Sequence, residues 1–305
     1  MRFAVTGGAG FVGSHLVNHL IKHGHSVSVI DNLHSGKKEN LSDILGQIEF
    51  HQEDIRNFEA LKKNLKNVDG VFHQAALTVV QESFEKPLEY HEVNVLGTEN
   101  ILKLAKEYGF KVVFASSSSV YGHKEEMPIG ENTEKKPINP YGKTKLQDED
   151  LFKKYSNLGT SIIGLRYFNI FGEGQTLDYS GVITRFLNRM KESKPPIIFG
   201  DGSQTRDFIF VGDIVKANLM AMESKSSNSL INIGSGKAIS ILQLANMIID
   251  FSDFDFQPIF EKPLDGDVQK SHADIALAKK LLRWEPKMEL KTWLQKKISD
   301  KDFDV

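Results

Sequence analysis

The sequence predicts an α/β protein with a doubly wound parallel sheet, followed by a smaller α/β domain. Short apolar runs alternate with segments of helical spacing from residue 3 to residue 167. A glycine-rich turn follows the first run, and polar residues follow later ones. Beyond residue 169 the alternation gives way to glycine- and proline-containing segments with shorter strands. We therefore expect one domain over residues 1–168 and a second over residues 169–305, with segments that interleave where the chain returns.

Composition excludes several classes of protein. The chain has 305 residues, of which 40% are hydrophobic and 26% charged, as expected for a globular protein with a sizeable core. Its net charge of −2 gives no basic field for nucleic acid or anionic lipid. With no cysteine, disulfides, thiolate zinc sites and a cysteine nucleophile are excluded. No apolar run approaches the ~20 residues of a membrane span, and the first strand begins at Arg2. We expect a cytoplasmic protein without a signal peptide or membrane contact.

The first strand, residues 3–5, ends in a tight glycine turn, and helical spacing resumes over residues 11–21. The stretch from Gly8 to Gly13 fits G-x-G-x-x-G. Residues without a Cβ allow backbone N–H groups and a helix N-terminus to approach a pyrophosphate. An ordinary βα turn is the alternative. The turn predicts a Rossmann dinucleotide site that includes Gly7, Gly10, Phe11 and Val12.

An acidic residue follows the next strand, residues 27–30. Asp31 lies eighteen positions beyond Gly13, near the ~20 expected for the acid that binds the adenosine ribose. Its carboxylate would repel a 2′-phosphate, so the sequence favours NAD over NADP; a solvated aspartate is the alternative. The loop expected to close over the adenosine contains Asn32, His34, Ser35 and Gly36.

Further strands are expected at residues 48–52, 71–73 and 111–115. Carboxyl ends of parallel strands meet at one edge, where ligands bind. The cofactor residues expected at this edge are Asp54, Ile55, Gln74, Ala75 and Ala76, with Asn94 inside a helix predicted over residues 88–108. The four serines 116–119 form either part of this crevice or a low-complexity loop.

A helix is predicted to begin at Asn139 and Pro140, an N-cap residue and a favoured first helical residue. Tyr141 and Lys145 are four residues apart, so they share one face of that helix. A neighbouring ammonium, together with a cationic nicotinamide, favours the phenolate form of a tyrosine. The pair predicts a tyrosine base with a lysine partner; an exposed surface pair is the alternative.

A sixth strand is expected over residues 162–167, and it ends in Phe168 and Asn169. In the second domain we expect a helix at residues 181–191, a strand at 197–199, and helices near 213–222, 240–249 and 274–284. Arg206 suits bidentate phosphate binding, with a surface ion pair to Asp207 as the alternative. His15, His19 and His23 share helical spacing but lie mostly on the polar side of the first helix, so we expect no metal site.

Together, the glycine turn, Asp31, Asp54, the serine run before Tyr121, and Tyr141-x-x-x-Lys145 resemble the extended short-chain dehydrogenase/reductase family. Within it the chain is most similar to the UDP-glucose/UDP-N-acetylglucosamine 4-epimerases, over nearly its whole length. The resemblance implies tightly bound NAD in the Rossmann domain and a UDP-sugar in the carboxyl-terminal domain. It implies epimerisation at C4 by transient oxidation, and a homodimer formed through helices near residues 92–108 and 141–155.

The resemblance also implies roles for single residues. Ser117 corresponds to the residue that binds the reacting hydroxyl, Tyr141 to the catalytic base, and Lys145 to its partner, which also binds the nicotinamide ribose. The cofactor positions that match are Asp31, Asn32, Asp54, Ile55, Ala75, Ala76, Asn94 and Phe168. The substrate positions that match are Asn169, Val182, Phe199, Arg206 and Asp267.

Four positions distinguish this chain among its relatives. Dehydratases have an Asp-Glu pair where Ser118 and Ser119 stand, and decarboxylases have a glutamate at the latter, so both reactions are disfavoured. Leu264 replaces the usual arginine, so diphosphate binding is expected to depend more on Arg206. Ser271 is small and is expected to leave room for a 2-acetamido group.

Two other functions stay open at this point. One is another NAD-dependent conversion of a nucleotide sugar, above all by a UDP-glucuronate 4-epimerase. The other is a non-catalytic NAD-binding sensor, which the joint presence of Ser117, Tyr141 and Lys145 disfavours. The resemblance does not fix which sugar is physiological.

Overall fold

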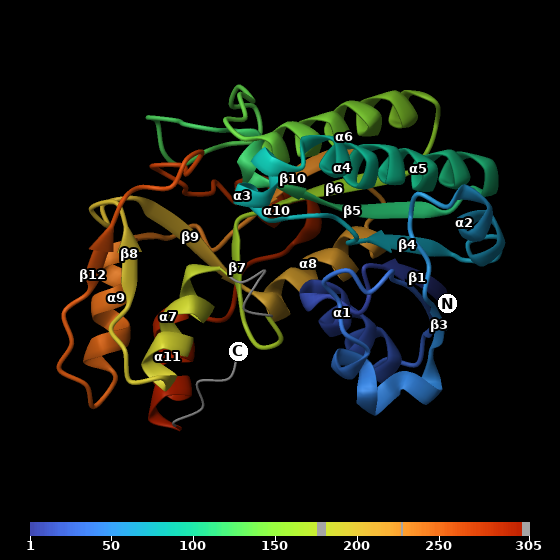
Figure 1. Cartoon of the computed structure of the whole chain (residues 1–305). Coiled ribbons are helices and arrows are strands. Elements are labelled where there is room, and N and C mark those ends of the chain that lie inside the picture. Colours follow the sequence, from blue (N-terminus) through green and yellow to red (C-terminus); the bar gives the residue numbers. More distant parts are fainter. Residues whose placement is uncertain (176–180, 227, 301–305) are drawn as a thin grey trace.

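The centre of the molecule is one parallel sheet. The computed structural model describes residues 1–175, 181–226 and 228–300 (Figure 1). Seven strands pair in the order β10-β6-β5-β4-β1-β2-β3, and every pairing is parallel. The strands are β1 (Arg2–Thr6), β2 (Ser26–Ile30), β3 (Glu49–His51), β4 (Gly70–His73), β5 (Lys111–Ser117), β6 (Ile162–Tyr167) and β10 (Ser229–Ile233). The predicted doubly wound sheet is confirmed, with one strand more than the six expected.

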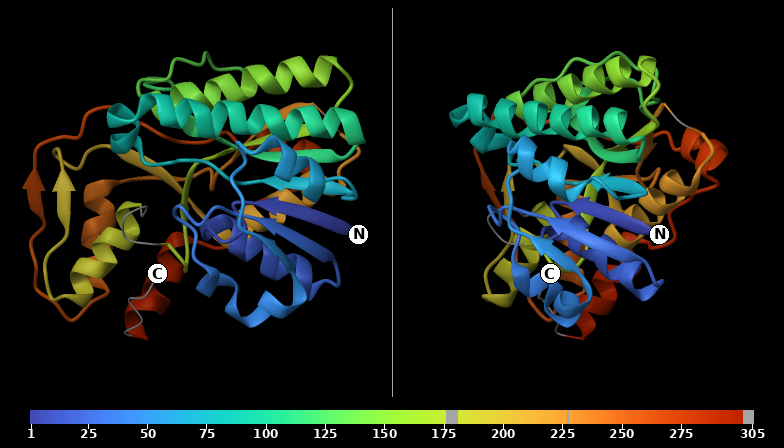
Figure 2. Two further views of the ribbon diagram at one scale, coloured as in Figure 1. Left: turned by 45° about the vertical axis from the view of Figure 1, so that its right-hand side comes forward. Right: turned by 90° about the vertical axis from the view of Figure 1, so that its right-hand side faces the viewer.

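Central strands read as apolar runs because both of their faces are covered. Every residue of β6 is buried, and so is every residue of β4. On one face lie α1 (Phe11–Lys22), α8 (Val211–Glu223) and α10 (Ala276–Leu282). On the other lie α2 (Phe58–Asn64), α5 (Gly97–Tyr108) and α6 (Pro140–Asn157). Figures 1 and 2 show these two helical layers on either side of the sheet.

The helix predicted over residues 88–108 is interrupted. α3 (Val80–Glu85) and α4 (Pro87–Tyr90) precede a π-helical segment, His91–Leu96, which continues into α5. Asn94 lies in this segment and is fully buried. Its Oδ1 accepts from Leu77 N at 2.8 Å, while its Nδ2 donates to Leu77 O at 3.0 Å and to Thr144 Oγ1 at 3.0 Å. Asn94 therefore ties the loop after β4 to α6.

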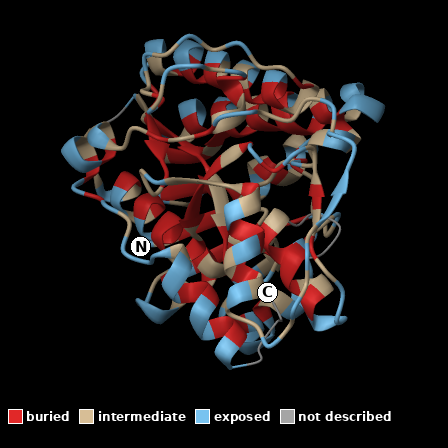
Figure 3. Cartoon of the chain, turned by 90° about the vertical axis from the view of Figure 1, so that its left-hand side faces the viewer, coloured by how far each residue is buried: buried red, intermediate tan, exposed pale blue. Residues whose placement is uncertain are grey.

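A second region packs around its own apolar core. A three-stranded sheet contains β11 (Ala238–Ser240), β9 (Thr205–Phe210) and β7 (Asn169–Phe171), and a two-stranded sheet contains β12 (Ile259–Glu261) and β8 (Ile197–Phe199). Helices α7 (Val182–Lys191), α9 (Ile241–Asp250) and α11 (Leu290–Ser299) supply most of the buried side chains, which include Phe186, Leu244 and Trp293. Figure 3 shows the buried interior beneath exposed outer helix faces.

The two regions interleave in the chain. β10 pairs with β6, and α8 packs on α1, although both elements follow residue 169. The division of the chain at residues 168 and 169 stays a prediction. Within the described residues no helix is both long and apolar enough to cross a bilayer.

Candidate active site

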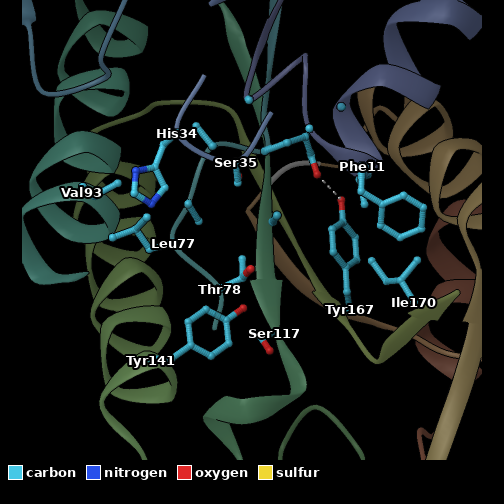
Figure 4. Close-up of a pocket in the computed structure, with 18 of the residues that line it drawn as sticks. Phe11, His34, Ser35, Leu77, Thr78, Val93, Ser117, Tyr141, Tyr167 and Ile170 are labelled. Atoms are coloured by element: carbon cyan, nitrogen blue, oxygen red, sulfur yellow. Dashed lines mark hydrogen bonds between the residues drawn. The ribbon is translucent and has the colours of Figure 1, made fainter. Parts of the chain in front are cut away.

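A cleft of about 440 Å³ opens at the carboxyl edge of the central sheet. Its lining comes from the ends of β1, β2, β4, β5 and β6 and from the helices that follow them. This is where ligands bind in open parallel sheets, because the loops after neighbouring strands diverge there. Figure 4 shows side chains from several of these strand ends pointing into the same space.

The glycine turn at the floor of the cleft has no room for side chains. A Cβ on Gly13 would lie 2.0 Å from Gly7 O, and one on Gly7 would lie 2.7 Å from Ala75 N. Gly7 also has a φ of +66°, a conformation that glycine adopts without strain. α1 begins after Gly10 with no side-chain cap and no acidic residue in its first turn. Its first N–H groups are therefore available to an anion such as a pyrophosphate.

Asp31 lies at the end of β2, beside this turn. Its Oδ2 accepts from Ala9 N at 2.9 Å, and its Oδ1 accepts from Leu33 N at 2.8 Å. Burial raises the pKa of the Asp31 carboxyl, and these two backbone hydrogen bonds oppose the rise. Each oxygen keeps a lone pair that can accept from a ribose hydroxyl. The glycine cradle and this carboxylate together fit an NAD molecule.

Most predicted cofactor residues line the cleft. These are Gly7, Gly10, Phe11, Val12, Asp31, Asn32, His34, Ser35, Ile55, Gln74, Ala75, Ala76, Tyr141, Lys145 and Phe168. Gly36, Asp54 and Asn94 lie outside the lining. A Cβ on Gly36 would approach Asp31 Oδ2 and Gly10 N to 3.0 Å each, so Gly36 lets the loop pack on the turn. Asp54 accepts from Asn32 Nδ2 at 2.9 Å and from Arg56, whose hydrogen bonds lower the pKa of Asp54 to about 2.

The three predicted catalytic side chains meet in this cleft. Ser117 ends β5 and caps the short 3₁₀ helix Ser118–Val120, accepting from Ser119 N at 3.1 Å. Tyr141 lies in the first turn of α6, where Asn139 caps the helix and Pro140 is its first residue, as predicted. In Figure 4 the Tyr141 ring projects from α6 toward Thr78 and Ser117.

Lys145 is buried one turn further along α6. Its Nζ donates to Ala115 O at 3.1 Å and to Asp148 Oδ2 at 3.2 Å. Asp148 is fully buried. Burial raises the pKa of Asp148 to about 6 against the opposing charge of Lys145. The ammonium is thereby held between β5 and α6, at the wall of the cleft.

A buried ion pair fixes α6 to the sheet. Arg166 on β6 donates from Nε and Nη2 to the two carboxylate oxygens of Glu149, at 2.7 and 2.8 Å. Ser116 Oγ donates to the same carboxylate at 2.7 Å, and Arg166 Nη1 donates to Tyr121 OH at 2.7 Å. Bidentate charge-assisted pairs of this kind set orientation as well as energy. They hold the helix that carries Tyr141 and Lys145 against the strand that ends at Ser117.

A second cleft of about 380 Å³ continues from the first. Six described residues line both clefts, namely Thr78, Val80, Ser118, Ser119, Asn169 and Gly181. The predicted substrate residues Asn169, Val182, Phe199, Arg206, Asp267 and Ser271 all line the second cleft. Leu264 lines it as well. Ser117 and Tyr141 line only the first.

Arg206 is held toward this cleft. It forms an ion pair with Asp267, and its Nη1 donates to Thr205 O at 2.7 Å. The alternative pairing with Asp207 is wrong. Asp207 is fully buried and accepts instead from Ser235 N at 2.6 Å and Ala273 N at 3.1 Å.

Sequence reasoning missed several lining or supporting residues, among them Thr78, Asp148 and Arg185. Arg185 follows Val182 by three residues in a predicted helix, so helical spacing was the available signal. Thr78 and Asp148 had no comparable signal. Among the described residues no group of three His, Cys, Asp or Glu side chains is placed to hold a metal. His15 Nε2 instead lies 2.8 Å from Glu173 O, and the rings of His19 and His23 stack.

Comparisons with known proteins agree with this geometry. The sequence profile of the NAD dependent epimerase/dehydratase family matches residues 3–234. The crystal structure of UDP-glucose 4-epimerase with UDP-glucose from Thermotoga maritima is 36% identical, with a TM-score of 0.94 over 99% of this chain and 98% of that one.

Two further solved structures are similar over nearly the whole chain. UDP-N-acetylglucosamine 4-epimerase from Methanobrevibacter ruminantium, in complex with UDP-N-acetylmuramic acid, is 36% identical, with a TM-score of 0.92 over 98% and 97% of the chains. UDP-glucuronic acid 4-epimerase from Bacillus cereus, with UDP-glucuronic acid and NAD, is 33% identical, with a TM-score of 0.91 over 99% of each chain.

Proposed function

Because the chain belongs to the NAD dependent epimerase/dehydratase family and the three solved structures described above are UDP-sugar 4-epimerases, we propose that it is a UDP-hexose 4-epimerase. It would interconvert UDP-glucose and UDP-galactose, and also UDP-N-acetylglucosamine and UDP-N-acetylgalactosamine. The observation that supports this most is the position of Tyr141 and Ser117 in the first cleft, next to the residues that line both clefts. A sugar lying between the two clefts would be within reach of both hydroxyl groups.

The chain's own residues supply binding and proton transfer. The glycine turn and Asp31 would hold NAD, which would supply reversible hydride transfer at C4 of the sugar. Tyr141 removes the proton from O4 during oxidation and gives it back during reduction, while Ser117 hydrogen-bonds the same oxygen. Lys145, one turn along α6 from Tyr141 and in the lining of the same cleft, is its partner in this proton transfer. The second cleft grips the nucleotide, so the 4-ketose can turn over without leaving.

The junction of the two clefts favours a neutral sugar. The six described residues shared by both clefts carry no charge, and positions 118 and 119 hold serines rather than acids. A uronate carboxylate in this junction would meet no cation among these residues. The resemblance implies that elimination and decarboxylation use acids at positions 118 and 119. Because this chain has serines there, both reactions are disfavoured.

The alternative is a UDP-glucuronate 4-epimerase. It is favoured by the hydroxyl groups of Thr78, Ser118 and Ser119, which can donate to a carboxylate, and by the similarity to the Bacillus cereus enzyme.

The test is to incubate the purified protein separately with UDP-glucose, UDP-N-acetylglucosamine and UDP-glucuronate and to resolve the products. We expect the 4-epimers of the first two and no reaction of the third. UDP-galacturonate as the main product would establish the alternative, and no product from any substrate would favour a sensor.

Ser271 provides a prediction about breadth of specificity. It is buried and lines the second cleft. We expect Ser271→Tyr to fill the space for a 2-acetamido group, lowering kcat/KM for UDP-N-acetylglucosamine by about 10-fold or more while changing UDP-glucose turnover less, since misfit in a pocket costs about 1–3 kcal/mol. Steady-state kinetics with both substrates measures this. Equal losses for both would show that Ser271 does not face the acetamido group.

A further inference from the structure

The charges in the second cleft do not balance those of a UDP-sugar. Its described lining contains four charged side chains, namely Arg185, Arg206, Asp267 and Lys270. Asp267 already neutralises Arg206, and Lys270 Nζ donates to Glu125 Oε2 at 2.7 Å. The diphosphate of a UDP-sugar carries one negative charge on each phosphate. If Arg206 acted alone, most of that charge would have no counter-charge in the cleft.

Arg185 is the lining cation whose charge is uncompensated. Its side chain is exposed, and within the described part of the chain it makes no ion pair. It lies in the first turn of α7, which begins after Gly181 with no side-chain cap and no acidic residue in that turn. A cation near a helix N-terminus is disfavoured by the helix dipole. A bound anion in the same cleft would remove this cost.

We propose that Arg185 is a second arginine that binds the diphosphate of the substrate, from α7, in addition to Arg206 on β9. This inference rests on the proposed UDP-sugar function and identifies a further binding residue for it. Gly181 and Val182, at the start of the same helix, also line the cleft. Leu264 lines the cleft too but brings no charge.

Calorimetric titration of the full chain, purified with its bound NAD, tests this with two probes: UDP and uridine. Arg185→Ala should weaken UDP binding by about 10- to 100-fold, because a hydrogen bond to a charged group is worth about 1.5–3 kcal/mol. The dissociation constant for uridine should change by less than about 2-fold, because uridine has no phosphate for Arg185 to bind. Lys194→Ala is the matched control, because it removes an exposed cation, paired with Glu192, from outside the cleft.

Two further variants separate a charge effect from a packing effect. Arg185→Lys keeps the charge but not the planar fork, so it should bind UDP with an affinity between those of the wild type and Arg185→Ala. Adding Leu264→Arg to Arg185→Ala should restore part of the lost UDP affinity and leave uridine binding unchanged. A double variant no tighter than Arg185→Ala would count against a role for charge.

The outcomes distinguish this inference from the proposed function. A wild-type protein that does not bind UDP would overturn both. UDP binding that Arg185→Ala leaves unchanged would overturn the inference alone. An equal loss for UDP and uridine would also overturn it, because it would place Arg185 against the base or ribose.

Discussion

The backbone of the glycine turn approaches itself more closely than any side chain permits. A Cβ on Gly13 would lie 2.0 Å from Gly7 O, a backbone atom that no rotamer change can move. We expect Gly13→Ala to displace the turn, with loss of bound NAD and about 1–3 kcal/mol or more of stability. NAD content of the purified protein and urea unfolding measure both effects.

Gly46→Ala is the control for this substitution, because a Cβ there would meet nothing within 4 Å. It should bind NAD as the wild type does. If Gly13→Ala kept its NAD and matched the stability of Gly46→Ala, the turn would not be the phosphate cradle described above.

Single residues were predictable where a spacing in the sequence marks their role. The glycine turn and the Asn139 cap depend on neighbours within a few positions. Asp31 contacts Ala9, far from it in sequence, but its position eighteen residues beyond Gly13 identified it. Asn94 could be singled out, but its hydrogen bonds to Leu77 and Thr144 could not, because those partners belong to other elements. The pairing of Arg206 with Asp267 instead of Asp207 was hidden for the same reason.

α6 depends on a buried charge pair for its position. The side chains of Arg166 and Glu149 are 2% and 1% exposed. Arg166→Met would leave the Glu149 carboxylate buried without its partner, so we expect a loss of about 3–5 kcal/mol in unfolding free energy. Turnover should fall as well, because α6 carries Tyr141 and Lys145. Urea unfolding and steady-state kinetics measure the two effects.

The matched control is Lys153→Ala on the same helix. It breaks a pair with Asp150 in which both side chains are more than half exposed, so the expected loss is about 0–1 kcal/mol. Arg166→Met as stable as Lys153→Ala would mean that the ion pair does not anchor the helix.

Elements with strong local patterns were predicted, and those defined by distant pairing were not. Strands β1 to β6 of the central sheet follow from their apolar runs. β10 was missed because residues 229–233 follow a long helix and pair with β6, more than sixty positions earlier. β12 is exposed at every residue and so has no burial pattern. The π-helical segment His91–Leu96 is a single turn that continues into α5, so it is too short for sequence spacing to distinguish it from an α-helix.

The stability of the whole molecule should depend on pH through His73. This side chain is buried in β4, with Nδ1 2.7 Å from Thr6 Oγ1 and Nε2 2.8 Å from Thr98 Oγ1. Burial, helped by the charge of Lys145, lowers the pKa of His73 to about 3, whereas an unfolded histidine has a pKa near ~6.5. Between these values the unfolded chain binds a proton that the folded chain does not. The contribution of neutral His73 to the unfolding free energy is therefore fully present above about pH 6.5, and it is lost as the pH falls toward the pKa of the folded state.

His73→Gln removes the titrating group and keeps hydrogen-bonding capacity. We expect it to be less stable than the wild type at pH 7.5, because two buried hydrogen bonds are disturbed. The difference in unfolding free energy between the wild type and His73→Gln should be smaller at pH 5, where only the wild type loses stability through His73. Urea unfolding at the two pH values measures this difference. An equal difference at both pH values would show that folding does not exclude the proton from His73.

Assembly of the molecule stays a prediction. The expected homodimer would use helices near residues 92–108 and 141–155. The side chains of Leu88 and Leu96, on α4 and the π-helical segment, are 79% and 46% exposed. A second copy packed on this face would cover them, so their exposure supports the proposal of a dimer.

The most direct test of the proposed reaction follows a single atom. UDP-glucose carrying deuterium at C4 is incubated with the purified protein and no added NAD, and the product is analysed by mass spectrometry and NMR. We expect UDP-galactose with the deuterium retained at C4, because the hydride leaves and returns within one site. UDP-galactose that has lost the label to solvent, or no UDP-galactose at all, would contradict it.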